Sequence, residues 1–142
     1  MSLDIRKANV GEFPRVRYFY QYCMKHTDKE HALMEVNEDL LQEAIQNEKV
    51  FLCFQYDTLV GALILDEKER EAWITHIAIH PAYFGKGMLN IMVQDALEKM
   101  RVNQVTKVHL FIPEGNIQTA NMFVNFGFQP HLGNWYEYQI EE

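Results

Sequence analysis

The sequence has no long hydrophobic run, and none of its apolar stretches approaches the roughly 20 residues that a membrane-spanning helix needs. It opens on no signal-peptide pattern, so we expect neither membrane insertion nor secretion. Positively charged residues are fewer than negatively charged ones: the chain has 13 Lys and Arg and 20 Asp and Glu, which gives a formal net charge of −7. This balance argues against nucleic acid as the main partner. An acidic surface favours basic small molecules or peptides, or serves solubility alone.

Cysteine is also scarce. Cys23 and Cys53 lie in aromatic or apolar surroundings and show no spacing typical of a metal site. This setting favours buried thiols over nucleophiles, and it predicts a reducing, cytoplasmic location. His76 and His80 are four residues apart, but no third ligand is evident in the sequence. We therefore expect no metal site.

Apolar residues, by contrast, are plentiful. The chain has 142 residues, 48% of them hydrophobic, which is ample for one buried core and marginal for two. It shows no repeat, no low-complexity stretch and no linker. We expect a single domain over residues 1–142.

The spacing of apolar residues predicts a succession of short strands and helices. Helices are expected at 12–26, with Pro14 in the first turn, at 37–47, capped by Asn37, at 86–101 and at 116–125. Strands are expected at 3–8, 49–56, 59–65, 72–79 and 107–113, with two more within 128–140. The charged run Asp66 to Glu71 is expected to be a turn, and residues 27–36 remain unassigned.

This order, β-α-α-β-β-β-α-β-α-β-β, predicts an α/β fold with a mixed, mostly antiparallel central sheet flanked by helices. The short connections between the early strands favour antiparallel hairpins. The helix at 86–101 acts instead as a crossover between two parallel strands.

The most informative segment is residues 80–89, His-Pro-Ala-Tyr-Phe-Gly-Lys-Gly-Met-Leu. An apolar strand precedes it and an amphipathic helix follows it. Such a turn presents backbone N–H groups and the positive end of a helix dipole to an anion. Gly85 and Gly87 permit backbone conformations that a side chain would block. The segment predicts a site for a phosphate-bearing ligand.

The element order, this glycine turn and the segment 116–128 together resemble the GNAT superfamily of N-acyltransferases over essentially the whole chain. In that family the turn reads Arg or Gln, two residues, Gly, one residue, Gly or Ala, and its amides hold the pyrophosphate of acetyl-CoA. The resemblance assigns this cofactor-binding role to Phe84, Gly85, Lys86, Gly87, Met88 and Leu89. The two glycines agree with the family, whereas Phe84 replaces a polar residue and Leu89 a small one.

The segment 116–128 resembles the family block whose helix lies beside the pantetheine arm of the cofactor. The resemblance implies that Asn116 contacts the cofactor and caps this helix. Phe123 stands where many relatives carry a tyrosine that protonates the departing CoA thiolate. Phenylalanine has no proton to give. Because a thiol titrates at about 8.5, we expect the loss to slow the reaction rather than prevent it.

The resemblance implies an N-acetyltransferase that transfers an acetyl group from acetyl-CoA, by direct attack, to a primary amine of a small molecule or peptide. Ile77 and Ile79 would contribute backbone contacts to the cofactor. His76 is the best-placed base, although a hydrogen-bonded structural histidine is the alternative. A bulge is expected in this strand, so whether Thr75 or His76 faces the cleft stays open. The rival functions are a non-catalytic acyl-CoA-binding or regulatory domain, and an interaction module without cofactor.

Tyr18, Tyr20 and Tyr22 cannot all face the core from one helix. Three roles are open for them. They can pack in the core with their hydroxyls toward water, or line an acceptor pocket that takes a cation by cation–π contact. They can also form a dimer surface, which makes a homodimer an alternative assembly.

Overall fold

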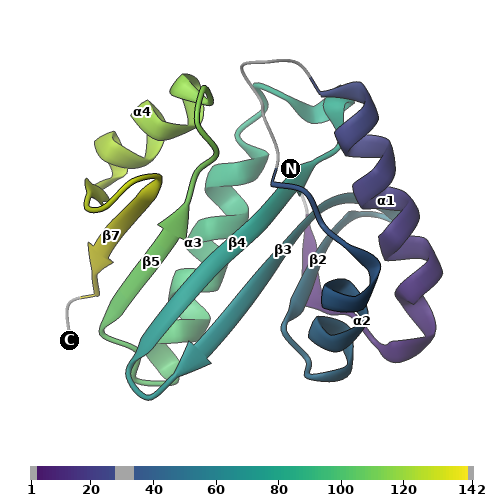
Figure 1. Ribbon diagram of the computed structural model, residues 1–142, viewed down its shortest axis with the longest axis horizontal. Helices are drawn as coiled ribbons and strands as arrows, with labels where there is room; N and C mark the ends of the chain where they lie inside the picture. Colours follow the sequence, from purple (N-terminus) through teal and green to yellow (C-terminus); the bar gives the residue numbers. More distant parts are fainter. Residues whose placement is uncertain (1–2, 28–33, 141–142) are drawn as a thin grey trace.

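The computed structural model describes residues 3–27 and 34–140 (Figure 1). Its elements are β1 (Asp4–Lys7), η1 (Val10–Glu12), α1 (Phe13–His26), α2 (Glu38–Gln46), β2 (Val50–Gln55), β3 (Thr58–Lys68), β4 (Glu71–Ile79), η3 (Pro81–Tyr83), α3 (Met88–Val102), β5 (Lys107–Phe111), α4 (Ile117–Phe126), β6 (Gln129–Pro130) and β7 (Trp135–Gln139). The predicted order of strands and helices is confirmed. The two short 3₁₀ turns, η1 and η3, were not predicted.

One seven-stranded sheet runs through the molecule in the order β1-β2-β3-β4-β5-β7-β6. Neighbouring strands are antiparallel except β4 and β5, which are parallel and joined by the crossover helix α3. The predicted mixed, mostly antiparallel sheet is therefore confirmed. β7 lies between β5 and β6, a placement that the chain order alone does not reveal.

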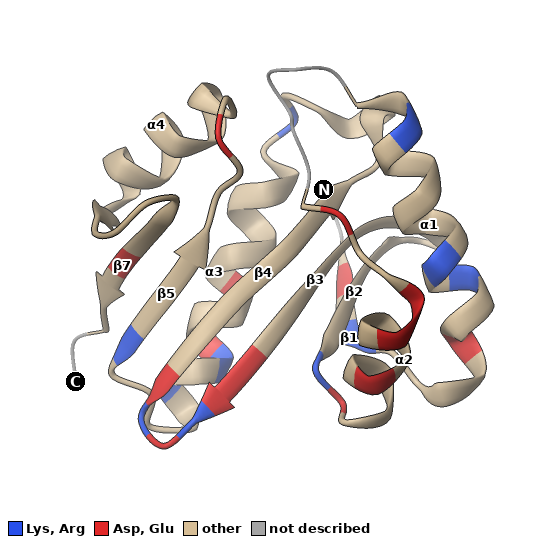
Figure 2. Ribbon diagram, viewed as in Figure 1, with Lys and Arg blue, Asp and Glu red and all other residues tan. Residues whose placement is uncertain are grey.

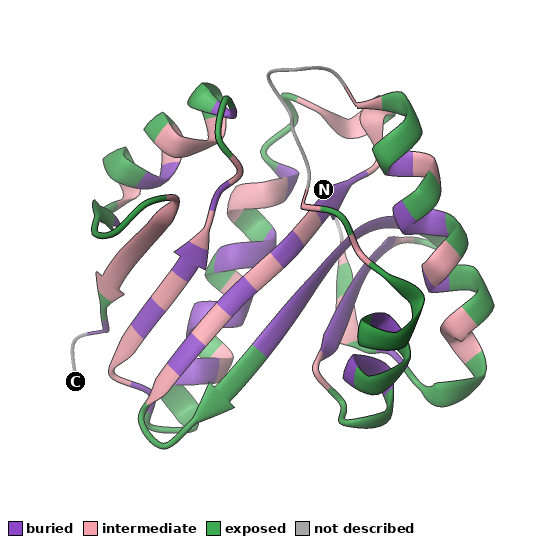
Figure 3. Ribbon diagram, viewed as in Figure 1, coloured by how far each residue is buried: buried purple, intermediate pink, exposed green. Residues whose placement is uncertain are grey.

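Helices cover the sheet on both faces. α1 and α2 pack on one face, where their apolar side chains join those of β2 and β3 in a buried cluster. α3 and α4 pack on the other face in a larger cluster that includes β4 and β5 (Figure 1). β4 alternates between buried and half-buried residues along most of its length (Figure 3). Among the helices of the described residues, none has the length and apolar composition needed to cross a bilayer.

The predicted turn over Asp66 to Glu71 is wrong. Asp66, Glu67 and Lys68 continue β3 and pair with the first residues of β4, and only Glu69 and Arg70 form the turn. Glu69 has the positive φ, +60°, that a two-residue hairpin connection demands. The charged side chains are exposed there, so their charge does not oppose strand pairing. Figure 2 shows acidic residues, in red, in this hairpin and in α2.

Two further boundaries differ from the sequence prediction by two residues, and the remaining differences are smaller or concern β3. α3 begins at Met88 rather than at residue 86, because Gly87 is in the left-handed conformation that ends the turn. The buried stripe of α3 accordingly starts with Met88, while Leu89 is only half-buried. β5 ends at Phe111, two residues before Pro113, which has no N–H to donate to a neighbouring strand.

Candidate functional site

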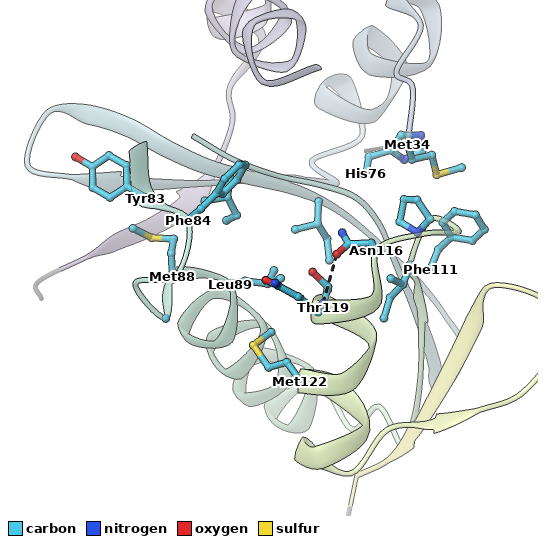
Figure 4. Close-up of a pocket in the computed structure, with 17 residues that line it drawn as sticks. Met34, His76, Tyr83, Phe84, Met88, Leu89, Phe111, Asn116, Thr119 and Met122 are labelled. Atoms are coloured by element: carbon cyan, nitrogen blue, oxygen red, sulfur yellow. Dashed lines mark hydrogen bonds between the residues drawn. The ribbon is translucent and has the colours of Figure 1, made fainter. Parts of the chain in front are cut away.

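A fork in the sheet defines the candidate site. The pairing of β4 with β5 ends at Ile74 and Leu110, although β4 continues to Ile79. A pocket of about 210 Å³ lies where the two strands separate, and it extends to the start of α3 and of α4 (Figure 4). Its walls are formed by Met34, His76, Ile77, Ile79, Tyr83, Phe84, Gly85, Gly87, Met88, Leu89, Phe111, Ile112, Pro113, Asn116, Gln118, Thr119 and Met122.

A β-bulge lies at the fork. Ala62 of β3 pairs with Ala78 of β4, and Ile64 pairs with Thr75. Between these two pairs the chain advances by two residues on β3 but by three on β4. The extra residue falls beside His76, whose φ of +52° is uncommon for a residue with a side chain. The predicted bulge is thus confirmed, and His76, not Thr75, lines the pocket. Strained backbone of this kind tends to occur at functional sites.

The imidazole of His76 is buried and hydrogen-bonded. Its Nδ1 lies 2.7 Å from the hydroxyl oxygen of Thr75. Burial lowers the pKa of His76 below its ordinary value, and a backbone hydrogen bond at Glu35 opposes that shift only in part. The ring is therefore neutral near pH 7, the state in which it can accept a proton.

Tyr20 fixes the bulge from the α1 side of the sheet. Its hydroxyl donates a hydrogen bond to the carbonyl oxygen of His76, at 2.7 Å. Burial raises the pKa of Tyr20 far above its ordinary value, so the hydroxyl keeps the proton that it donates in this hydrogen bond. Tyr18 is exposed, and Tyr22 stacks against the ring of His80 and contacts the ring of His26 at a tilt. The tyrosines therefore have different surroundings, and the sequence pattern did not indicate the contact between Tyr20 and the bulge.

The backbone of β4 faces the fork beyond the bulge. The N–H of His80 donates to the carbonyl of Val60 on β3, at 2.9 Å. Hydrogen-bonding directions alternate along a strand, so the N–H of Ile79 points away from β3, toward the open side. Ile77 and Ile79 both line the pocket. The fork thus leaves the N–H of Ile79 directed toward the pocket rather than toward β3.

The glycine turn lies at the opposite end of the same pocket. Gly85 and Gly87 have φ values of +76° and +75°. At either residue no heavy atom of the described chain lies within 4 Å of where a Cβ would stand, so glycine is required for conformation rather than space. The turn runs directly into α3, and the N–H groups of Met88 to Asn90 have no preceding helix carbonyl to bind. Together these groups form an anion-binding arrangement.

Most of the residues that the sequence analysis singled out lie on the pocket wall. Of the expected cofactor contacts, Ile77, Ile79, Phe84, Gly85, Gly87, Met88, Leu89 and Asn116 line it. Lys86 does not line it; this residue is exposed, with its Nζ 5.4 Å from the centre of the Tyr83 ring.

Phe123 is also absent from the wall. It is fully buried and packs edge-on against Phe128, with ring centres 5.5 Å apart. α4 instead presents Thr119 and Met122, which lie three residues apart and share one helix face. Phe123 belongs to the neighbouring face, which enters the core.

Asn116 fixes the start of α4 at the pocket. Its Oδ1 accepts a hydrogen bond from the N–H of Thr119, at 3.3 Å, and caps the helix as expected (Figure 4). Sequence reasoning missed the part of the wall that comes from Phe111 to Pro113 and Met34, and its list of cofactor contacts began one residue after Tyr83. The point at which β4 and β5 separate brings Phe111 to Pro113 to the site.

The described residues contain no group of three His, Cys, Asp or Glu side chains placed to hold a metal ion. Both cysteines are free and buried. Burial raises the pKa of Cys23 to about 12 and that of Cys53 to about 11. Neither thiol is ionised at neutral pH, and neither lines the pocket.

Comparison with known proteins identifies both a family and a fold. The acetyltransferase (GNAT) family model matches residues 12–128. No curated protein sequence matches the chain. The PaiA N-acetyltransferase of Thermoplasma acidophilum, solved with coenzyme A, has a TM-score of 0.80 at 17% identity, over 99% of this chain and 100% of that one.

Two other solved structures share the architecture. The ribosomal-protein-S18-alanine N-acetyltransferase of Escherichia coli has a TM-score of 0.81 at 16% identity, over 99% of this chain and 96% of that one. The N-acetylglutamate synthase of Neisseria gonorrhoeae, complexed with coenzyme A and N-acetyl-glutamate, has a TM-score of 0.80 at 14% identity. That match covers 100% of this chain and 36% of the synthase.

Proposed function

This chain belongs to the GNAT acetyltransferase family, and from that membership we propose that it is a single-domain enzyme that transfers an acetyl group from acetyl-CoA to a primary amine of a small molecule or peptide. One observation carries the proposal. A single pocket joins the glycine turn at the start of α3 to the fork between β4 and β5. An anion-binding turn and a strand N–H directed into the fork are the two parts that an acyl-CoA needs.

The residues present fit the donor substrate. Gly85, Gly87 and the first N–H groups of α3 would hold the pyrophosphate, since the turn has the left-handed conformation and open space that close backbone approach requires. Ile77 and Ile79 on β4, and Asn116 at the N-cap of α4, would hold the pantetheine arm. Phe84 and Leu89 supply no polar side chain here, but their backbone amides are not altered by that change.

In the proposed reaction the amine nitrogen forms a bond to the thioester carbon, the C–S bond breaks, and coenzyme A leaves as its thiolate, which then takes a proton from water. N–H groups of β4 would polarise the thioester carbonyl. His76, buried and neutral, would accept the proton that the amine loses. Direct attack is supported by the chemistry of Cys23 and Cys53, whose raised pKa values make them poor nucleophiles. The free thiols also support a cytoplasmic location.

A second function, a non-catalytic acyl-CoA-binding or regulatory domain, is favoured by one specific observation. Phe123 occupies the position of the family's proton-donating tyrosine, and its ring is buried in the core. With Phe84 and Leu89 also departing from the family pattern, binding without turnover is the alternative outcome.

Two measurements test these proposals in order. Isothermal titration calorimetry with acetyl-CoA should detect binding, and its absence at millimolar cofactor would contradict both functions. A thiol-release assay with acetyl-CoA and a panel of amines and peptides then separates them. Release that depends on one class of amine supports the enzyme, whereas binding without release across the panel supports the non-catalytic domain.

A further inference from the structure

We propose that His80 is a positioning residue for the glycine turn, and that it sets the affinity for coenzyme A without touching it. This inference rests on the proposed function. His80 is not among the residues that line the pocket. Its hydrogen bonds and ring contacts nevertheless fix the segment from which the turn starts.

The first link is a set of hydrogen bonds between β4 and η3. The N–H of His80 is tied to Val60 on β3, and its carbonyl accepts from the N–H of Tyr83 at 2.8 Å. Its ring Nδ1 accepts from the N–H of Ala82 at 3.1 Å, so the side chain caps η3. Asn, Asp, Ser or Thr usually fill this capping role. Phe84 follows η3 directly and begins the turn.

The second link is a row of ring contacts. The imidazole of His80 stacks on Tyr22 of α1, with ring centres 5.1 Å apart and planes 28° apart. It also meets the ring of Tyr83, at 5.8 Å and 88°. Tyr83 lines the pocket and carries the ammonium of Lys86 over its ring. Loss of the imidazole therefore removes support from a residue of the pocket wall.

Phe84 packs against the larger core cluster, but the three residues that follow it are less closely held. No described heavy atom lies within 4 Å of where a Cβ would stand on Gly85 or Gly87, and the N–H of Lys86 donates a long hydrogen bond, 3.4 Å, to the carbonyl of Tyr83. Its geometry therefore depends on the segments at its two ends, namely η3 and α3. A ligand that needs the turn in one conformation binds more tightly when that conformation is already held.

Three substitutions separate the two links. His80→Asn keeps an acceptor for the Ala82 N–H but removes the ring, His80→Phe keeps the ring but removes the acceptor, and His80→Ala removes both. We expect His80→Ala to weaken coenzyme A binding about tenfold, measured by calorimetry, with smaller losses for the other two variants. In turnover, the KM for acetyl-CoA should rise while kcat stays near that of the unchanged protein.

His131→Ala is the matched control, because His131 is an exposed histidine outside the pocket. It should bind coenzyme A as the unchanged protein does. Thermal unfolding is followed for every variant. If His80→Ala or His80→Asn loses thermal stability but keeps full affinity, His80 has a structural role only and the proposal is overturned. If the unchanged protein binds no coenzyme A, the proposed function itself has failed.

Discussion

At the scale of single residues, His76 combines a strained backbone, a buried ring and a place on the pocket wall. We predict that His76→Asn lowers kcat by about 10²–10⁴-fold, the usual contribution of a general base. Asparagine is chosen because it tolerates a positive φ better than most residues, so the bulge should survive. Near-ultraviolet circular dichroism of the variant checks that the fold is retained.

The pH dependence of the same residue provides an independent check. Burial places the pKa of His76 below its ordinary value of 6.5, so the neutral, proton-accepting ring persists as the pH falls to that value. The acid limb of a kcat/KM profile should therefore lie below pH 6.5 and should vanish in His76→Asn. An acid limb that survives the substitution would assign the base to another group.

Phe123 gives the second prediction at this scale. The family resemblance suggests that Phe123→Tyr would restore a proton donor and raise the rate. The side chain is 0% exposed and packs on Phe128, so a hydroxyl there would lie in the core. We expect no gain in thiol release and a loss of ~1–3 kcal/mol in the free energy of unfolding, from burial of an unpaired hydroxyl. Denaturant unfolding and the release assay measure both, and a faster release would contradict this view.

At the scale of elements, Arg6 and Glu12 join β1 to the start of α1. The guanidinium of Arg6 donates to both carboxylate oxygens of Glu12, at 2.7 and 2.8 Å, and Asn9 donates its N–H to the same carboxylate. The hydrogen bond from Arg6 is the largest cause that lowers the pKa of Glu12 to about 2. We predict that Glu12→Gln costs ~1–2 kcal/mol at pH 7, because half-exposed Arg6 is partly screened by water.

The sign of the pH effect follows from the lowered pKa. The stabilisation by Glu12 is fully present above its ordinary pKa of 4.5 and is lost as the pH falls toward about 2. The stability difference between the unchanged protein and Glu12→Gln should therefore shrink between pH 4.5 and 2 in urea unfolding. Glu98→Gln, which breaks an exposed pair with Arg101, should change stability by less than ~0.5 kcal/mol.

The turn before α3 offers a controlled pair of glycine substitutions. Gly87 and Gly133 both have a positive φ, +75° and +59°, and open space around the missing Cβ. An alanine should cost ~1–2 kcal/mol of stability at either position, since both conformations are left-handed. Only Gly87→Ala should also weaken coenzyme A binding, because Gly133 is not on the pocket wall. If calorimetry finds equal affinities for coenzyme A in the two variants, the turn does not contribute to binding of this ligand.

The elements themselves were largely readable from the sequence, because apolar periodicity and caps are local. Asn37 and Asn116 cap α2 and α4 where expected. The errors also have local causes: charged residues were assigned to the hairpin turn, yet Asp66 to Lys68 pair with β4. Side-chain polarity does not decide strand pairing where the strand is exposed.

At the scale of the whole molecule, the fork could not be derived from residue patterns. Its position depends on where β4 and β5 stop pairing and on the insertion of β7 beside β5, both of which are long-range. The resemblance to a family predicted the cleft residues on β4 and in the turn, but not that Met122 rather than Phe123 would face the pocket. That distinction depends on how α4 is rotated against the sheet.

The pocket is bordered by β4, the glycine turn and α3 on one side of the fork, and by the end of β5 and α4 on the other. One ligand in this pocket would therefore contact segments on both sides of the fork. We predict that acetyl-CoA at 100 times its Kd stabilises the protein by about 2.7 kcal/mol and raises its Tm by roughly 8–10 °C, the shift expected for a chain of this length. Scanning calorimetry across a series of ligand concentrations measures both. Gly87→Ala should show a smaller shift at the same concentration, while Gly133→Ala should show the full one. A Tm that does not respond to acetyl-CoA, in a protein that still unfolds cooperatively, would mean that the fork and the turn do not act as one site.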